Sequence, residues 1–351
     1  MAVLPELLNW VPAGVLMALE SIERSGVTHF PAHYSGPTLG EVGEHRAIEE
    51  IVTVAPSTRN GDDAAVLSHA SPNSRAVATT DMLIEGRHFR VDWSTPEEIG
   101  QKAIVQNFAD VEAMGARPIA ALLAVSAPPH TPLSFIRGIA AGIAQRVGEY
   151  SAELVGGDLT SGDDLVLSVT AIGSLGGSRP ALTLDRARPG QQVVAHGRLG
   201  WSAAGLALLT RFGRDGVPED LSALVDAHCA PHLNPGRGVI ARATGATSMT
   251  DNSDGLIADV GTIARLSGVG VDLDAAALAP DELLVRAGRL LDADPWEWVL
   301  AGGEDHALLC TTAGAPPSGF RPLGRVVRGG RDHDVTVDGA APAYGHGWVS
   351  F

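Results

Sequence analysis

The chain is almost devoid of lysine. Among its 351 residues it has 25 basic side chains, and only Lys102 is a lysine while the others are arginine. A Walker A phosphate loop needs a lysine directly after glycine in a glycine-rich run, but Lys102 follows Gln101 with no such run before it. The scarcity therefore excludes a P-loop nucleotide site and leaves Schiff-base chemistry a single candidate.

Cysteines and long apolar runs are also scarce. Cys229 and Cys310 lie far apart without a CxxC partner, so buried inert thiols are favoured over a zinc site or a disulfide framework. No stretch approaches the roughly 18 apolar residues of a membrane span. The apolar segment 7–19 has no basic region before it, which argues against a signal peptide. We therefore expect a cytoplasmic protein.

Positive charge as a whole is in short supply. Forty-one acidic residues stand against 25 basic ones, which gives a formal net charge of -16. This balance argues against a nucleic acid or an anionic membrane surface as the main partner. A negatively charged ligand would need bridging cations.

Composition indicates a globular protein with more than one domain. Hydrophobic residues make up 45% and charged residues 19% of the chain, and domains commonly hold roughly 100 to 200 residues. Residues 1–37 differ from the rest and are interpreted as an N-terminal extension. The stretch 173–189, rich in glycine, proline and arginine, is the best boundary candidate. The predicted division is 1–37, 38–180 and 181–351.

Capping signals and hydrophobic periodicity predict strands that alternate with helices. Thr95 and Glu98 form a capping box, so a helix is expected over 96–114. Asn107 and Asp110 share one face of that helix. The alternation indicates an α/β or mixed α+β fold. Further strands are predicted at 76–80, 165–172, 193–195, 271–273 and 306–310, and further helices at 202–210, 256–266 and 281–291.

Acidic residues recur beside glycines or at predicted strand ends. Each case alone is typical of a solvated turn. Carboxylates brought together repel unless some bind protons or a cation lies among them, and Mg²⁺ prefers a few carboxylates together with substrate phosphates. Neighbouring glycines would let phosphates approach backbone NH groups. The pattern predicts a nucleotide site with several magnesium ions. Its segments are Gly61-Asp62-Asp63, Thr79-Thr80-Asp81, Gly156-Gly157-Asp158, Asp251-Asn252-Ser253-Asp254-Gly255 and Gly302-Gly303-Glu304-Asp305.

Other metal and nucleophile motifs do not fit. An EF-hand loop counted from Asp251 places Thr262 where the motif needs glutamate. The chain has neither a GxSxG nucleophile elbow nor an HExxH zinc motif. By position alone, His88 is as well explained as an ordinary loop histidine, and Trp348 is better explained as an aromatic anchor of the chain end.

Taken in order, these segments resemble the thiamine-monophosphate kinases, of the superfamily that includes aminoimidazole ribonucleotide synthetase. The resemblance runs from about Thr38 to Phe351 and includes the five acidic segments, residues 107–116 and the closing Gly347-Trp348. It implies an N-terminal α/β domain that pairs in a homodimer and a C-terminal α/β domain that closes over the cleft. The implied reaction transfers the γ-phosphoryl group of ATP to thiamine phosphate, with several Mg²⁺ ions and, as a further option, a monovalent cation.

The resemblance also implies roles for single residues. Asp81, Asp110 and Asp254 would be catalytic. ATP would be faced by Gly157, Asp158 and Ser253, with Tyr150 near the nucleotide. The thiamine phosphate pocket would be lined by His88, Glu304 and Trp348, where Glu304 offsets the thiazolium charge. The implied magnesium ligands are Asp63, Thr79, Thr80, Asp81, Asp110, Asp158, Asp251 and Asp254.

The chain departs from the family pattern at one position of consequence. Leu184 stands where the family has an arginine that reaches ATP, and Arg179 and Arg186 are the nearby substitutes. A catalytically inactive nucleotide-binding relative is therefore one alternative. The other alternative is a different enzyme of the superfamily. This chain lacks the reactive cysteines that selenophosphate synthetase and the hydrogenase-maturation enzyme carry, and aminoimidazole ribonucleotide synthetase fits the segment 302–305 less well.

Overall fold

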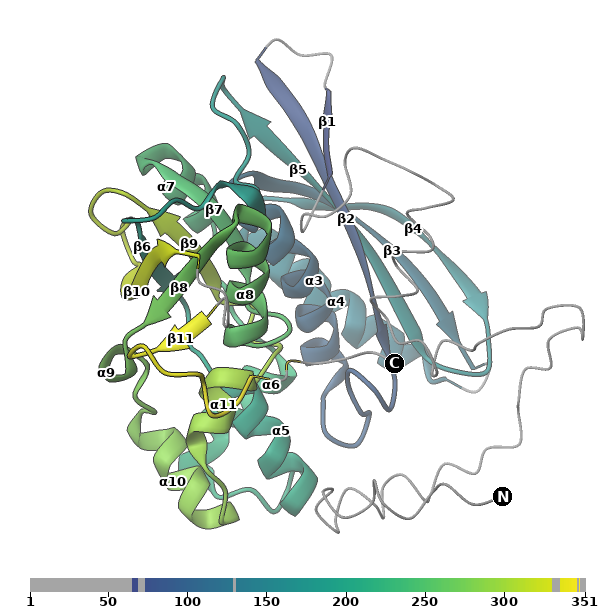
Figure 1. Cartoon of the computed structure of the whole chain (residues 1–351). Coiled ribbons are helices and arrows are strands. Elements are labelled where there is room, and N and C mark those ends of the chain that lie inside the picture. Colours follow the sequence, from purple (N-terminus) through teal and green to yellow (C-terminus); the bar gives the residue numbers. More distant parts are fainter. Residues whose placement is uncertain (1–64, 69–72, 129–130, 330–334, 346, 348–351) are drawn as a thin grey trace, which may run out of the picture.

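The computed structural model describes residues 65–68, 73–128, 131–329, 335–345 and 347. Two sheets form the described part (Figure 1): a five-stranded sheet in the order β1-β2-β5-β3-β4 and a six-stranded sheet in the order β11-β8-β10-β6-β9-β7. The predicted mixed α/β fold is confirmed. The extension over 1–37 lies outside the described residues, and the division at residue 180 stays a prediction, although the two sheets fall on either side of it.

The first sheet is antiparallel except for the parallel pair β3 and β4. Helices α3 and α4 pack together and cover one of its faces (Figure 1). Strand β4 lies at the edge, and every one of its residues is exposed. The elements are β1 (Ala65–Ser68), β2 (Ser74–Ile84), α3 (Pro96–Ala113), β3 (Arg117–Ala127), α4 (Leu133–Glu149), β4 (Glu153–Ser161) and β5 (Val166–Gly176).

The second sheet is antiparallel except for the parallel pair β8 and β11. Its strands are β6 (Gln192–His196), β7 (Ala246–Asp251), β8 (Val269–Leu273), β9 (Leu308–Thr312), β10 (Arg321–Arg328) and β11 (Val335–Val337). Its helices are α5 (Trp201–Phe212), α6 (Ser222–Cys229), α7 (Arg237–Thr244), α8 (Leu256–Ser267), α9 (Ala275–Leu278), α10 (Glu282–Leu291) and α11 (Pro295–Ala301), with single 3₁₀ turns at Leu184–Arg186 and Glu219–Leu221.

Helix α3 lies between the two sheets (Figure 1). Phe108 belongs to the core that α3 shares with the first sheet. Val105 and Ala109 belong to a separate core with Met249 and Cys310 of the second sheet. The helix is therefore buried on several sides, as a helix with apolar residues around most of its circumference must be.

The predicted start of α3 is confirmed in detail. The Thr95 hydroxyl accepts from the Glu98 amide at 3.3 Å, and the Glu98 carboxylate accepts from the Thr95 amide at 2.8 Å. The predicted bounds of 96–114 match the observed 96–113. A Cβ on Gly100 would collide with the carbonyl of Ile139 in α4, so glycine here lets α3 and α4 pack closely.

Other elements were predicted less completely. The strand expected to end at Asp81 continues to Ile84, so Asp81 lies inside β2. Gly156, Gly157 and Asp158 lie inside β4 rather than in a turn, because backbone pairing with β3 imposes the strand and an edge position tolerates glycine. Both thiols, Cys229 and Cys310, are buried as expected. In the part of the chain that the structure describes, no helix combines the length and apolar character of a membrane span.

A buried carboxylate ties α3 to the second half of the chain. Glu112 is inaccessible to solvent and accepts from the amides of Gly236 and Gly238, both at 2.6 Å. Burial raises the pKa of Glu112 to about 7, although the hydrogen bonds from the two backbone amides oppose the shift. The folded pKa thus lies above the usual value of 4.5, and between these pH values the folded chain holds a proton that the unfolded chain has released.

We expect the stability contribution of Glu112 to fall as the pH rises through that window. Glu112→Gln removes the titration and flattens the dependence of the unfolding free energy on pH, while Glu282→Gln, at an exposed carboxyl of α10, leaves it unchanged. Urea denaturation at both ends of the window measures the effect. An equal pH dependence in Glu112→Gln and the wild type would contradict the assignment.

Candidate functional site

The first part of the site is the contact between β2 and α3. Thr79 and Asp81 alternate with Thr80 along β2, so their side chains point to the same face of the sheet, the one that α3 covers. The Thr79 hydroxyl donates to Asp110 Oδ2 at 2.7 Å, and the Asp81 amide donates to Asn107 Oδ1 at 3.0 Å. The shared face of Asn107 and Asp110 is thus turned toward β2.

A carboxylate of the second sheet adjoins this contact. Asp251 ends β7, is 2% exposed, and accepts from His306 Nδ1 at 2.9 Å. Burial raises the pKa of Asp81, and the negative charge of Asp251 raises it further. Asp81 and Asp110 of the first half and Asp251 of the second therefore form one electrostatic unit, here called the aspartate site.

The aspartate site offers oxygen donors of the kind that a hard cation prefers, but these donors do not converge on one point. Among the described side chains, no three of the types Asp, Glu, His and Cys converge closely enough to hold a metal ion. Beside Asp251, the buried atoms Asn252 Oδ1 and His306 Nε2 have no hydrogen-bond partner within the described residues. Buried polar atoms usually have partners, so these two indicate a place for water or a polar ligand.

Two acidic segments of the second half are joined backbone to backbone. The Glu304 amide donates to the Ser253 carbonyl at 2.8 Å, and the His306 amide donates to the Asn252 carbonyl at 3.1 Å. A Cβ on Gly303 would collide with the Ser253 carbonyl. Glu304 and His306 have φ values of 60° and 51°, a left-handed backbone that non-glycine residues adopt at a cost, typically at ligand sites. The loops 252–255 and 302–306 thus act as one unit.

Glu304 and His88 meet at Lys102. The Lys102 ammonium lies 2.8 Å from the His88 carbonyl and 3.3 Å from Glu304 Oε2. Burial alone would raise the pKa of Glu304, but the charge of Lys102 lowers it below its usual value. His88 Nδ1 accepts from the Ile84 amide at 3.0 Å, and burial lowers the pKa of His88. His88 is therefore neutral near pH 7, with Nε2–H as its donor.

A cavity of about 350 Å³ adjoins this group. It is lined by Glu304, His228, Trp298 and Arg87, and Gly347 also reaches it. Burial, with Lys102 second, lowers the pKa of His228 to about 3, so this ring is neutral. The cavity therefore has two acidic side chains in its lining, Glu304 and Glu297, and an aromatic wall, Trp298.

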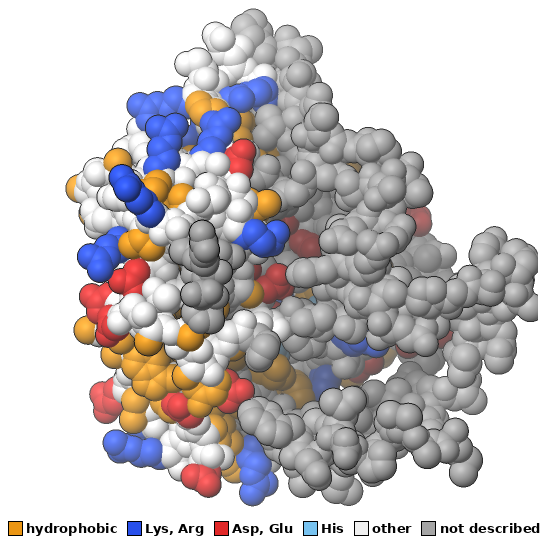
Figure 2. All heavy atoms as spheres, in the orientation of Figure 1, with side chains coloured by type: hydrophobic (Ala, Val, Ile, Leu, Met, Phe, Trp, Pro, Cys, Tyr) orange, Lys and Arg blue, Asp and Glu red, His pale blue; other side chains and the backbone are white. Residues whose placement is uncertain are grey.

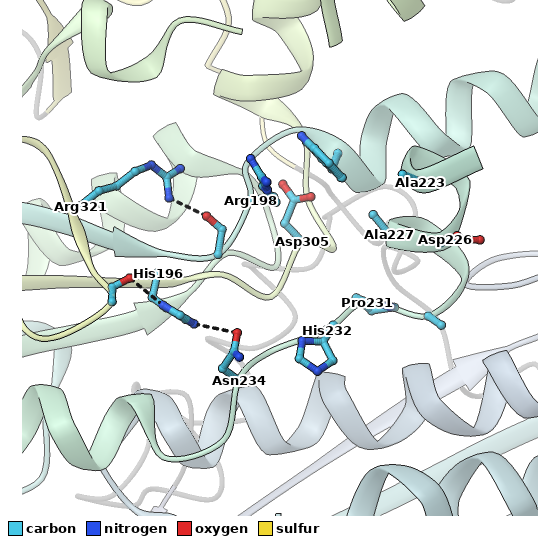
Figure 3. A pocket seen from close by; sticks show the side chains of 14 residues that line it. His196, Arg198, Ala223, Asp226, Ala227, Pro231, His232, Asn234, Asp305 and Arg321 are labelled. Carbon is cyan, nitrogen blue, oxygen red and sulfur yellow. Dashed lines mark hydrogen bonds between the residues drawn. The ribbon is translucent and has the colours of Figure 1, made fainter. Parts of the chain in front are cut away.

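A second, larger cavity of about 540 Å³ lies beside α6, which lines part of it (Figure 3). Its walls include Arg198, Arg321, His196 and His232, and none of the residues to which the resemblance assigns a role lines it. Asp305 also borders it and accepts from the amides of Gly200 and Ser202 at the start of α5. Burial raises the pKa of Asp305 to about 7 against these hydrogen bonds.

The structure does not bring every predicted residue to the site. Alternation along β2 turns Thr80 away from Asp81, and its hydroxyl donates to the Val169 carbonyl at 3.0 Å. The Thr80 side chain is thus not a ligand in common with Asp81, and only its backbone is available. Register pairs Asp158 with Ala124 on the face opposite Asp81, so these carboxylates are not brought together.

Tyr150 is placed in the protein core. It is 4% exposed, packs edge-on against Phe108 with ring centroids 5.0 Å apart, and donates its hydroxyl to the Leu233 carbonyl at 2.8 Å. The expected contact of this side chain with a nucleotide is therefore wrong for the described arrangement, because ring and hydroxyl are both engaged. Asp63 and Trp348 lie outside the described residues.

Basic residues lie close to Leu184, which stands where the family has an arginine. Leu184 is 5% exposed and belongs to the core of the second half. A cavity of about 230 Å³ near it is lined by Arg179, Arg186, Arg188 and Arg242. Figure 2 shows basic side chains gathered over the upper part of this face, where α7 lies in Figure 1. Arg179 itself is engaged, since it donates to the carbonyls of Arg242 and Ala243.

Sequence reasoning missed Lys102, His228 and His306 as members of the site. The sequence singled out Lys102 as the one lysine, but it gave no sign that the side chain would meet Glu304 across 202 positions of the chain. His306 follows the acidic segment directly, and that adjacency was the available signal.

Similarity to known proteins agrees with this geometry. Residues 61–175 match the family described as AIR synthase related protein, N-terminal domain. A thiamine-monophosphate kinase of Corynebacterium glutamicum is 66% identical over 90% of this chain and 96% of that protein. One of Mycobacterium tuberculosis is 45% identical over 90% of this chain and 93% of that protein.

Solved structures agree as well. The structure of AaThiL complexed with AMPPCP and TMP is 31% identical, has a TM-score of 0.81, and covers 90% of this chain and 99% of that one. The hydrogenase maturation protein HypE in complex with ATP shares the fold at a TM-score of 0.60 and 19% identity, over 90% of this chain and 95% of that one. Because identity of 66% extends over nine tenths of its length, the chain belongs to the thiamine-monophosphate kinase family.

Proposed function

We propose that the chain transfers the γ-phosphoryl group of ATP to thiamine phosphate and yields thiamine diphosphate and ADP. The observation that carries this function is the adjacency of the aspartate site to the cavity of Glu304, through the joined loops 252–255 and 302–306. One part provides oxygen ligands for the ions that accompany phosphates, and the other provides a carboxylate and an aromatic wall for a cationic, aromatic acceptor.

The donor atoms of the aspartate site are of the kind that Mg²⁺ ions prefer. The donors are hard oxygens from Asp81, Asp110 and Asp251, with Thr79 beside them. After burial, the negative charge of Asp251 is the second cause of the raised pKa of Asp81, and a bound cation would offset it. Bound there, Mg²⁺ would screen and orient the phosphates. Asp63, Asp254 and the backbone of Thr80 stay proposed ligands, and a monovalent cation stays an option. Asp158 stays a proposed ligand of a different ion, because it lies on the face of the sheet opposite Asp81.

The chain's own residues would mainly bind and orient. The second pKa of a phosphate is roughly 6, so the acceptor is largely ionised near neutral pH and needs no strong base. Glu304 offsets the thiazolium charge, neutral His88 donates from Nε2, and Trp348 stacks on an acceptor ring. Ser253 and Gly157 face ATP, and a side chain on Gly157 would collide with the Leu123 carbonyl. Positioning and charge neutralisation then account for the rate.

The proposed enzyme is a cytoplasmic homodimer that pairs through its first sheet. Large hydrophobic side chains are exposed on this sheet: Val155 at 54% and Leu159 at 64% on the edge strand β4, Leu122 at 36% on the adjacent β3, and Met82 at 51% on β2, farther from that edge. An uncovered edge strand with apolar side chains promotes association, and a second copy of the same edge provides a closed partner.

Conversion of ATP and thiamine phosphate to ADP and thiamine diphosphate, followed by chromatography with and without Mg²⁺, tests the reaction. We expect both products in equal amounts and only with Mg²⁺. Asp81→Asn and Asp110→Asn should each lower kcat by at least about 100-fold because each removes a charge from the metal site. Asp215→Asn, at an exposed carboxyl, serves as the control.

The outcome separates the alternatives. ATP binding without either product would favour a non-catalytic relative and point to Leu184 as the missing contact. Full activity in Asp81→Asn or Asp110→Asn would refute the placement of the metal site.

The dimer is tested by a charge on its proposed interface. Leu159→Glu should convert the dimer to a monomer, because it buries a carboxylate against the same edge of the partner. Leu290→Glu, on exposed α10 and 46% exposed, should leave the dimer intact. Sedimentation equilibrium measures both. A wild-type monomer, or a Leu159→Glu dimer of unchanged affinity, would contradict pairing through β4.

A further inference from the structure

We propose that Lys102 is a positioning residue that fixes the two walls of the thiamine phosphate pocket relative to each other. The inference rests on the proposed function, because Glu304 lines the cavity of about 350 Å³ while His88 is a pocket residue only under that function. Lys102 itself is 1% exposed and does not reach the cavity surface, so it acts through these two neighbours.

The contacts of Lys102 join two parts of the chain that no strand pairing among the described residues connects. Its ammonium donates to the His88 carbonyl at 2.8 Å in the turn that follows β2 of the first sheet. It donates to Glu304 Oε2 at 3.3 Å in the loop before β9 of the second sheet. Lys102 projects from α3, which lies between the sheets, and so links the loops of both.

The burial of this charge makes the link specific. A buried ammonium is costly unless it is paired and hydrogen-bonded, and removal of one partner leaves the other charge uncompensated. Glu304 is the acidic partner of Lys102 within ion-pair distance in the described chain. His228, 3.6 Å from the same oxygen, is neutral because burial and Lys102 lower its pKa to about 3. Lys102 therefore keeps Glu304 ionised and in place.

The backbone at Glu304 explains why such a restraint is needed. Its left-handed φ of 60° is unfavourable for a residue with a side chain. The loop is held by the hydrogen bond from the Glu304 amide to the Ser253 carbonyl and by the ion pair with Lys102. At the other end, the turn of His88 positions the imidazole through the Ile84 amide and the carbonyl through Lys102. Loss of the ammonium would release both walls at once.

The identity of the residue fits this role. Every other basic residue is arginine, yet this slot holds the one lysine of the chain. An ammonium is a compact point charge that satisfies a carbonyl and a single carboxylate oxygen, whereas a guanidinium is a planar fork that suits bidentate partners. A slot closed to solvent with these two acceptors favours the smaller head group.

The test compares Lys102→Met, Glu304→Gln and their double variant by steady-state kinetics. We expect Lys102→Met to raise the KM for thiamine phosphate about 10-fold or more, with the KM for ATP little changed. If Lys102 acts partly through Glu304, the effects of the two single variants are less than additive in the double variant, because the share that passes through Glu304 is already lost in Glu304→Gln. Lys102→Gln, which keeps a donor for the His88 carbonyl without the charge, provides the same comparison should the methionine variant fail to fold.

Arg146→Met is the matched control. Arg146 is 3% exposed and pairs with Glu149 at 2.9 Å away from this cavity, so its loss should lower stability but leave the KM for thiamine phosphate unchanged. Additive effects in the double variant, or equal KM changes for both substrates, would reduce Lys102 to a support of the fold and overturn the inference. A wild type that does not phosphorylate thiamine phosphate would refute the proposed function itself.

Discussion

The burial of α3 between two sheets is the constraint on which the rest of the structure depends. A helix in this position must present apolar side chains in several directions, and Val105, Phe108 and Ala109 do so. Each polar group that it carries must find a partner at the interface. The polar groups of α3 are for this reason the points at which the two halves of the chain are tied together.

These ties differ in charge along the helix. In the first half of the helix, the ammonium of Lys102 contacts Glu304. In the second half, Asn107 and Asp110 contact β2, and in the last turn Glu112 accepts from the amides at the start of α7. The pocket with the carboxylate wall and the aspartate site thus lie along a single helix, one turn or two apart. Their relative position follows from helical geometry, not from flexible loops.

Part of this arrangement could be predicted from the sequence. The capping box at Thr95 is local, so it fixed the start of α3, and helical spacing placed Asn107 and Asp110 on one face. Alternation along a strand, applied to 79–81, would also have separated Thr80 from its neighbours. Strand β4 was missed because it pairs with a strand distant in the sequence. Every one of its residues is exposed, so no alternation of buried and exposed positions marks it. The Lys102 contact depends on the packing of both halves and has no local signature.

The burial of both native thiols has an experimental consequence. Cys229 and Cys310 are 1% and 0% exposed, and burial raises the pKa of each thiol, so neither forms a reactive thiolate readily. The chain contains no other cysteine. A cysteine introduced on the surface of each sheet would therefore accept a fluorophore selectively in the otherwise native chain. Energy transfer between two such dyes would report how the distance between the sheets changes while substrates are bound and released.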